Sequence, residues 1–109
     1  KNVIKDKKIK NYTLRYQVLA GLPSKELRNI VDQGKKEINE GVIFAFSIFE
    51  ERVGVAVGVT KKLTEQFDAV TLVKKAAEIL GGKGGGGRAD FAQAGGVNKN
   101  KIEPTLRAI

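Results

Sequence analysis

The chain contains neither cysteine nor histidine among its 109 residues. Without cysteine there is no disulfide framework and no thiol nucleophile. Without histidine, the commonest general base and the commonest metal ligand are both missing. Ser-His-Asp, Cys-His and zinc-dependent chemistry are therefore excluded. Only a mechanism built on aspartate and glutamate remains open to this chain.

Aromatic side chains are also scarce, at 6% of the residues and with no tryptophan. The few tyrosines and phenylalanines fall in strand patterns, so we expect them in the core. Binding of single-stranded nucleic acid relies on bases stacking on aromatic rings, and this composition argues against that mode. It suits recognition of folded RNA through its shape and backbone.

Long apolar runs are missing as well. None approaches the ~18–20 residues of a membrane span, so we expect no membrane partner. The lysine-rich start lacks the apolar stretch of a signal peptide. We interpret residues 1–11 as the remnant of a connection from the preceding part of a longer chain, and residues 12–109 as one domain.

Positive charge, in contrast, is abundant: 20 lysines and arginines against 12 acidic residues give a net charge of +8. Such a surplus favours a polyanionic partner, because lysine and arginine displace the counterions of phosphates. The alternative is that the lysines serve only solubility. At 41% apolar residues, the chain can form one modest core.

The spacing of the apolar residues predicts the main elements. Alternation predicts strands at 12–20 and 53–59, and an uninterrupted apolar run predicts a strand at 42–49 that is buried on both faces. Helical spacing predicts one helix that stops at Gly41 and a second over 70–80. In the 53–59 strand, valine alternates with glycine and alanine, so we expect a helix packed closely against the glycine side.

A final short helix is predicted where Asn100 and Glu103 form a capping pair. The order of elements indicates an α+β (mixed α/β) fold in a single small domain. We expect a short sheet with helices packed mainly on one face, and a glycine-rich loop before the last helix.

Residues 81–96, GGKGGGGRADFAQAGG, are the most informative segment. Glycine is costly to order, so eight glycines in sixteen positions need a reason. A binding loop is one reason, because bare backbone N–H groups approach a phosphate closely while Lys83 and Arg88 face it. A helix cap, a flexible linker or an Arg88–Asp90 ion pair is the structural alternative.

Two nucleotide-binding motifs do not fit this segment. The dinucleotide fingerprint needs a strand before the glycines and a helix after them, whereas a helix precedes them here. The P-loop needs Gly-Lys followed by serine or threonine, and here Gly87 is followed by Arg88 and Ala89.

The glycine segment resembles the signature near the end of alanyl-tRNA synthetases, in the DHHA1-type domain. The resemblance extends through LPSKELRNIVDQ and VIFAFSIFEERVGVAVGVTKKL, in the order of the family. It differs in having four glycines before Arg88, where the family usually has three, and Ala89 where proline is frequent.

The resemblance implies a tRNA-binding accessory domain with no catalytic residues and no cofactor of its own. This domain would contact the tRNA corner and help the aminoacylation and editing domains share one alanine tRNA. The parent enzyme would be a cytoplasmic alanine–tRNA ligase that uses ATP, magnesium and zinc. The candidate RNA-binding residues are Lys83, Gly84, Gly85, Gly86, Gly87, Arg88, Asp90 and Gln93, with Lys74 and Lys75 as a possible extension.

Two other functions stay open at this point. DHHA1-type domains also occur in phosphodiesterases that degrade short oligonucleotides, but their glycine motif carries a histidine that this chain lacks. The other is a dimerisation module, in which the edge of the valine–glycine strand or the last helix pairs with a second copy.

Overall fold

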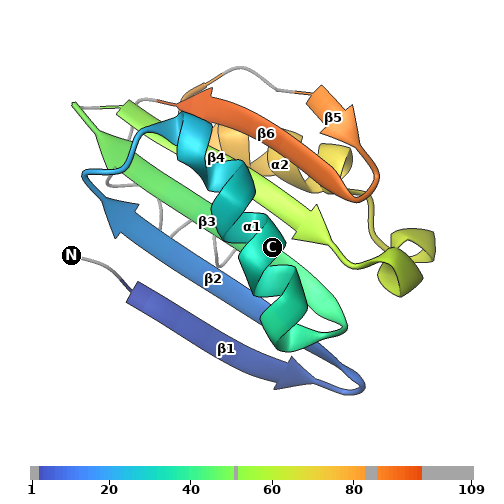
Figure 1. Ribbon diagram of the computed structural model, residues 1–109. Helices are drawn as coiled ribbons and strands as arrows, with labels where there is room; N and C mark the ends of the chain where they lie inside the picture. Colours follow the sequence, from blue (N-terminus) through green and yellow to red (C-terminus); the bar gives the residue numbers. More distant parts are fainter. Residues whose placement is uncertain (1–2, 51, 83–85, 97–109) are drawn as a thin grey trace.

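The structure, a computed structural model, describes residues 3–50, 52–82 and 86–96. Six strands form one mixed sheet in the order β1-β2-β3-β4-β6-β5 (Figure 1). Strands β2 and β3 are parallel, and every other neighbouring pair is antiparallel. The strands are β1 Val3–Ile9, β2 Tyr12–Ala20, β3 Gly41–Phe49, β4 Arg52–Val59, β5 Gly86–Arg88 and β6 Phe91–Gly96. The helices are α1 Leu27–Ile38 and α2 Ala69–Ile79, each preceded by a short 3-10 turn, η1 Ser24–Glu26 and η2 Lys61–Glu65.

The α+β fold class is confirmed, but the expectation of helices mainly on one face is wrong. Helix α1 packs on one face of the sheet and α2 on the other (Figure 1). The cause lies in β3, whose first seven residues are all buried. Its even-numbered residues join the α2 core and its odd-numbered residues join the α1 core. An apolar strand of this kind needs cover on both faces, so one helix goes to each.

Strand β4 presents a different surface to each helix. Its valines join the core beneath α2. Its glycines face α1, and a Cβ built on Gly58 would lie 2.3 Å from Val31 Cγ1. A Cβ on Gly54 would lie 2.7 Å from Ser24 Cβ. The expectation that a helix packs closely against the glycine side is confirmed.

Residues 3–9 form a strand that the sequence did not reveal. Strand β1 pairs antiparallel with β2, from Ile9 opposite Tyr12 to Val3 opposite Val18. It is an edge strand, and its lysines are exposed, so its apolar alternation is weak. The residues that we assigned to a connection therefore extend the sheet, while the division of the chain at residue 11 stays a prediction.

Arg15 of β2 ties β1 and α1 together. It is 9% exposed, its Nε lies 2.7 Å from Asp6 Oδ1, and its Nη1 donates to Glu37. Hydrogen bonding by Arg15 holds the pKa of the Asp6 and Glu37 carboxyl groups below their usual range. The hydrogen bond that Arg15 donates to Asp6 in turn raises the pKa of Arg15.

Three further expectations need correction. Helix α1 ends at Ile38, where Asn39 takes φ 67°, and Gly41 is instead the first residue of β3. Much of the glycine-rich segment is strand rather than loop, since it contains β5 and β6. The valine–glycine strand β4 lies between β3 and β6, so it has no free edge for a second copy. The expected last helix lies outside the described residues.

Candidate nucleic-acid interface

The β5–β6 turn is held in place from three other elements. The Asp90 carbonyl accepts hydrogen bonds from the Val59 N–H of β4 at 3.0 Å and from Lys35 Nζ of α1 at 2.8 Å. The neighbouring Ala89 carbonyl accepts a bond of 3.0 Å from the Ala69 N–H at the start of α2. The part of the glycine segment that carries Arg88 is therefore fixed on the rest of the fold.

Three of the described glycines of the segment, Gly82, Gly87 and Gly96, have a packing reason. A Cβ on Gly87, whose φ is 155°, would lie 2.2 Å from the Phe91 carbonyl oxygen. A Cβ on Gly82 would lie 1.7 Å from the Gly95 carbonyl oxygen, and one on Gly96 would lie 2.6 Å from Leu80 Cβ. These glycines let the end of α2 and the two strands approach one another.

Gly86 and Gly95 differ from the others. A Cβ on Gly86 would meet no atom within 4 Å, and one on Gly95 would meet only the Val53 carbonyl oxygen, at 3.7 Å. Neither has a positive φ. Neither packing nor backbone conformation requires glycine at these two positions, so their bare backbone is available to a ligand.

Arg88 stands on the α1 face beside the turn. Its side chain is 70% exposed, and its Nε lies 3.6 Å from Asp90 Oδ1. This is the Arg88–Asp90 ion pair that the sequence offered as a structural explanation of the glycine segment. It is opposite Phe91 in the β5–β6 register, and the guanidinium carbon of Arg28 lies 4.8 Å from the centre of the Phe91 ring. An exposed ion pair is weak, so Arg88 keeps its capacity for a phosphate.

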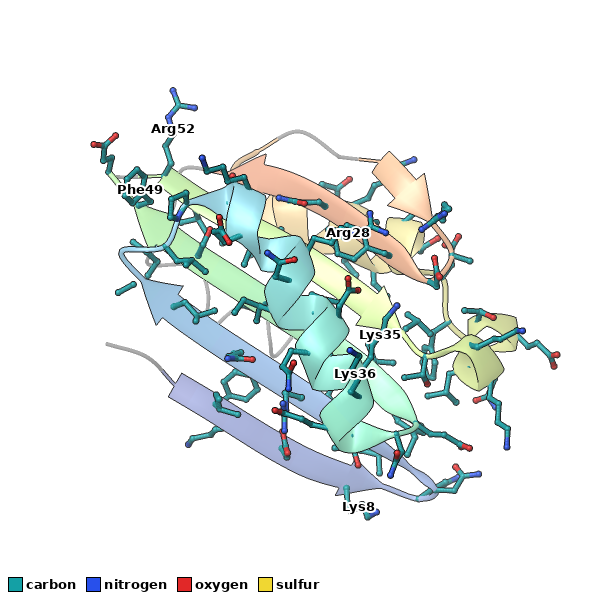
Figure 2. The ribbon with its side chains drawn as sticks, in the orientation of Figure 1. Lys8, Arg28, Lys35, Lys36, Phe49 and Arg52 are labelled. Carbon is teal, nitrogen blue, oxygen red and sulfur yellow. The ribbon has the colours of Figure 1, made fainter. Side chains whose placement is uncertain are left out.

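Arg28, Lys35 and Arg88, which surround the turn on this face, are called the turn cluster below. Figure 2 shows Arg28 and Lys35 extending from α1 toward β6 and β4. Arg28 also lies 4.0 Å from Asp32, and Lys35 is committed to the Asp90 carbonyl. The cluster is therefore cationic and partly neutralised, with Arg88 as its most exposed member.

The remaining sequence-predicted residues do not all gather there. Gln93 Nε2 donates to the Ser24 carbonyl at 2.8 Å, so its amide joins β6 to the turn before α1. Lys74 and Lys75 are exposed on α2, which covers the opposite face, and they do not extend the turn cluster. Gly86 and Gly87 form the edge strand β5. Lys83, Gly84 and Gly85 lie outside the described residues.

A second feature lies at the opposite end of the sheet, where β3 ends and β4 begins. It is a hollow of about 480 Å³, called the end hollow below. Its wall consists of the turn before α1, the β3–β4 corner and the glycines at the ends of α2 and β6. The lining residues are Pro23, Ser24, Lys25, Ser47, Phe49, Arg52, Val53, Gly54, Gly82, Gly95 and Gly96.

Sequence reasoning missed Lys25, Phe49 and Arg52. We expected the phenylalanines in the core, but Phe49 is 39% exposed and stands at the corner beside Arg52, which extends away from the sheet (Figure 2). The available signal was its position: Phe49 is the last residue of an apolar run, directly before charged residues.

The described residues contain no group of three or more aspartate, glutamate, histidine or cysteine side chains that could hold a metal ion. Within the same residues, no helix is long and apolar enough to cross a membrane.

Comparison with known proteins identifies the family. The model of the DHHA1 domain matches residues 11–109. The alanine–tRNA ligase of Hyphomonas neptunium is 48% identical over 101 residues, which are 93% of this chain and 12% of that protein. The enzyme of Rhodopseudomonas palustris is 47% identical over 97 residues, 88% of this chain and 11% of that protein. The chain thus spans about a tenth of the length of these relatives.

Comparison with solved structures supports the same family assignment. The C-Ala domain of Aquifex aeolicus alanyl-tRNA synthetase superposes with a TM-score of 0.87 at 30% identity, covering 95% of this chain and 93% of that domain. A DHH-domain protein described as a member of the s1p family of ribosomal proteins superposes with a TM-score of 0.56 at 22% identity, covering 96% of this chain and 26% of that one. The second similarity concerns the fold alone. The resemblance that the glycine segment suggested is confirmed.

Proposed function

Because this chain belongs to the DHHA1 domain family and has the fold of a C-Ala domain, we propose that it is a tRNA-binding accessory domain of an alanine–tRNA ligase. In this role it contacts the corner of the folded alanine tRNA. The contact helps the aminoacylation and editing domains of the cytoplasmic parent enzyme act on one tRNA. Those domains, with their ATP, magnesium and zinc, carry the chemistry.

The observation that carries the proposal is the fixed position of the turn cluster. Arg88 is exposed on a turn that hydrogen bonds from β4, α1 and α2 hold in place. A fixed cation next to the bare backbone of Gly86 suits contact with a phosphate, because little order has to be gained on binding. The net charge of +8 adds long-range attraction to the same partner.

Contacts of this kind position a nucleic acid without reading its bases. A domain that works through them recognises the shape and the phosphate spacing of a folded RNA. Specificity for the alanine tRNA would then come from the parent enzyme as a whole, while this domain supplies affinity and orientation.

The test is a titration of the 109-residue chain against folded tRNA and against an unstructured RNA of equal length, each at two salt concentrations. We expect tighter binding of the folded form. Binding should weaken steeply with salt, because each phosphate contact releases counterions. Equal affinity for both RNAs, or no binding of tRNA at low salt, would overturn the proposal.

A further inference from the structure

The end hollow combines three properties that a binding site for a nucleotide needs. Its volume of about 480 Å³ lies within the ~300–1,000 Å³ typical of small-ligand sites. Lys25 and Arg52 line it, and no acidic residue does so among the described residues. Phe49 contributes an aromatic ring that is 39% exposed.

The cations of the hollow differ from those of the turn cluster because they have no protein partner among the described residues. Within the described part of the chain, Lys25 and Arg52 take part in no ion pair or side-chain hydrogen bond, and both residues are exposed. Arg88, in contrast, is paired with Asp90. An anion that enters the end hollow would therefore not have to break an ion pair or a side-chain hydrogen bond between these cations and the described part of the chain.

The sheet register brings the aromatic ring and a cation together. Phe49 and Arg52 are opposite one another at the β3–β4 corner, so their side chains start from the same face. That is the α1 face, on which Lys25 lies in the turn before α1. Figure 2 shows Phe49 and Arg52 at this corner, far from the end of α1 that carries Lys35 and Lys36.

Glycines from β4 and β6 form the floor of the end hollow, and packing does not explain one of them. Gly54 and Gly95 are opposite one another in β4 and β6. Gly54 makes room for Ser24, whereas a Cβ on Gly95 would meet nothing closer than 3.7 Å. A side chain at Gly95 would enter the hollow rather than the protein, and its absence keeps the floor open.

We propose that the end hollow receives one exposed nucleotide of a folded RNA, with its base stacked on Phe49 and its phosphate contacted by Lys25 and Arg52. The inference rests on the proposed function and adds a second contact surface to it, at the end of the sheet away from the turn cluster. The base provides a flat apolar face for the ring, and the phosphate complements the two cations.

The first experiment measures the affinity of the 109-residue chain for folded tRNA as a function of salt. We expect Lys25→Gln and Arg52→Gln each to weaken binding several-fold and to lower the salt slope by about one. Phe49→Leu should weaken binding by roughly tenfold while the slope stays the same, because stacking releases no counterion. Phe49→Tyr, which keeps the ring, should restore the affinity.

Lys36→Gln is the matched control, since it removes an exposed cation from the same face at the other end of α1. It should change the affinity less than either cation of the hollow. A thermal melt of each variant shows whether the fold is retained. Equal losses for Lys36, Lys25 and Arg52 would mean that only net charge matters, and would overturn the inference.

The second experiment tests the base contact directly. The chain has no tryptophan, so Phe49→Trp introduces a single fluorescent reporter. Folded tRNA should quench it by stacking, whereas heparin, a polyanion without bases, should bind without quenching. Equal quenching by both would show that the hollow takes any anion and would overturn the assignment of a base.

These outcomes separate the two proposals. If the unmodified chain does not bind tRNA, the proposed function fails. If it binds tRNA and Arg88→Ala weakens the binding while all three hollow variants bind normally, only the end hollow is wrong. If folded and unstructured RNA bind equally well, the proposed function fails; hollow variants that still lose affinity for RNA would then support the nucleotide site in the end hollow alone.

Discussion

Replacing Gly58 by alanine tests how closely α1 lies on the sheet. The new Cβ would be 2.3 Å from Val31 Cγ1 and 3.0 Å from Lys35 Cε, whereas ordinary contact starts at 3.4 Å. The lysine end is flexible and can move. Val31 cannot, because it is fully buried and a valine in a helix has essentially one side-chain rotamer. The helix itself must therefore shift by about an ångström.

Overpacking of this kind costs about 1–3 kcal/mol, and the rigid neighbour places Gly58→Ala near the upper end. Replacing a strand glycine by alanine returns roughly 0.5–1 kcal/mol of backbone entropy. We expect a net loss of about 2 kcal/mol in the free energy of unfolding. For a domain of this size that lowers the melting temperature by roughly 10 °C. Urea unfolding should give a lower midpoint with an unchanged slope.

Gly95→Ala is the matched control, because the same chemical change there meets open space. It should leave stability unchanged or raise it slightly. A double-mutant cycle with Val31→Ala completes the test, since the smaller side chain removes the atom that the new Cβ meets. The pair should cost clearly less than the sum of the single changes. Strict additivity, or equal effects at Gly58 and Gly95, would refute the close approach of α1 to β4.

Three other predictions can be tested with the same chain. Lys83→Ala and Arg88→Ala should each weaken tRNA binding by on the order of 1 kcal/mol while the melting temperature stays nearly constant; unchanged affinity with a clearly lower melting temperature would make the glycine segment scaffold only. Arg15→Gln should lower stability at neutral pH, as seen in urea unfolding. Because Arg15 lowers the pKa of Asp6 and Glu37, its contribution is complete above their ordinary values near 4 and fades as the pH falls through the lowered ones, so the gap between variant and parent should narrow in acid. The chain should neither activate alanine nor hydrolyse mischarged tRNA or oligonucleotides, and turnover above that of a heat-killed sample would contradict this.

The buried elements could be predicted from the sequence because burial alone determines their apolar patterns. The continuous apolar run of β3 and the valine–glycine alternation of β4 both record burial, and the structure places each as expected. These patterns do not indicate which helix packs against each face of the sheet. The apolar run of β3 was correctly assigned two buried faces, yet nothing in the sequence said that a different helix covers each one.

Polar residues were harder to interpret, because their partners are distant in sequence. Arg15 alternates with apolar residues in β2, and this pattern by itself predicts that it lies on the open face of the strand. That face is closed by Asp6 of β1 and Glu37 of α1, which no local pattern connects to it. Strand β1 was missed for the related reason that an edge strand with exposed lysines has almost no apolar period.

The candidate site was predictable in type and only partly in position. The glycine segment identified the family, which the comparisons confirm. The segment's sequence did not show that Gly82, Gly87 and Gly96 are needed for close packing. A glycine required by a tight contact cannot be distinguished in the sequence from a glycine that contacts a ligand. The end hollow was missed because its lining comes from three separate parts of the sequence, which only the folded sheet brings together: residues 23–25, then 47, 49 and 52–54, then 82, 95 and 96.

The two edges of the sheet have a consequence for how copies of this chain behave at high concentration. Among the described strands, β1 and β5 have free sides, and free strand edges pair with other sheets to form aggregates. β5 offers only three residues. β1 is longer, but Lys5, Lys7 and Lys8 are exposed along it, so a second copy laid against it would bring ammonium groups together. The lysines that obscured the strand in the sequence thus protect the sheet against polymerising through its own backbone.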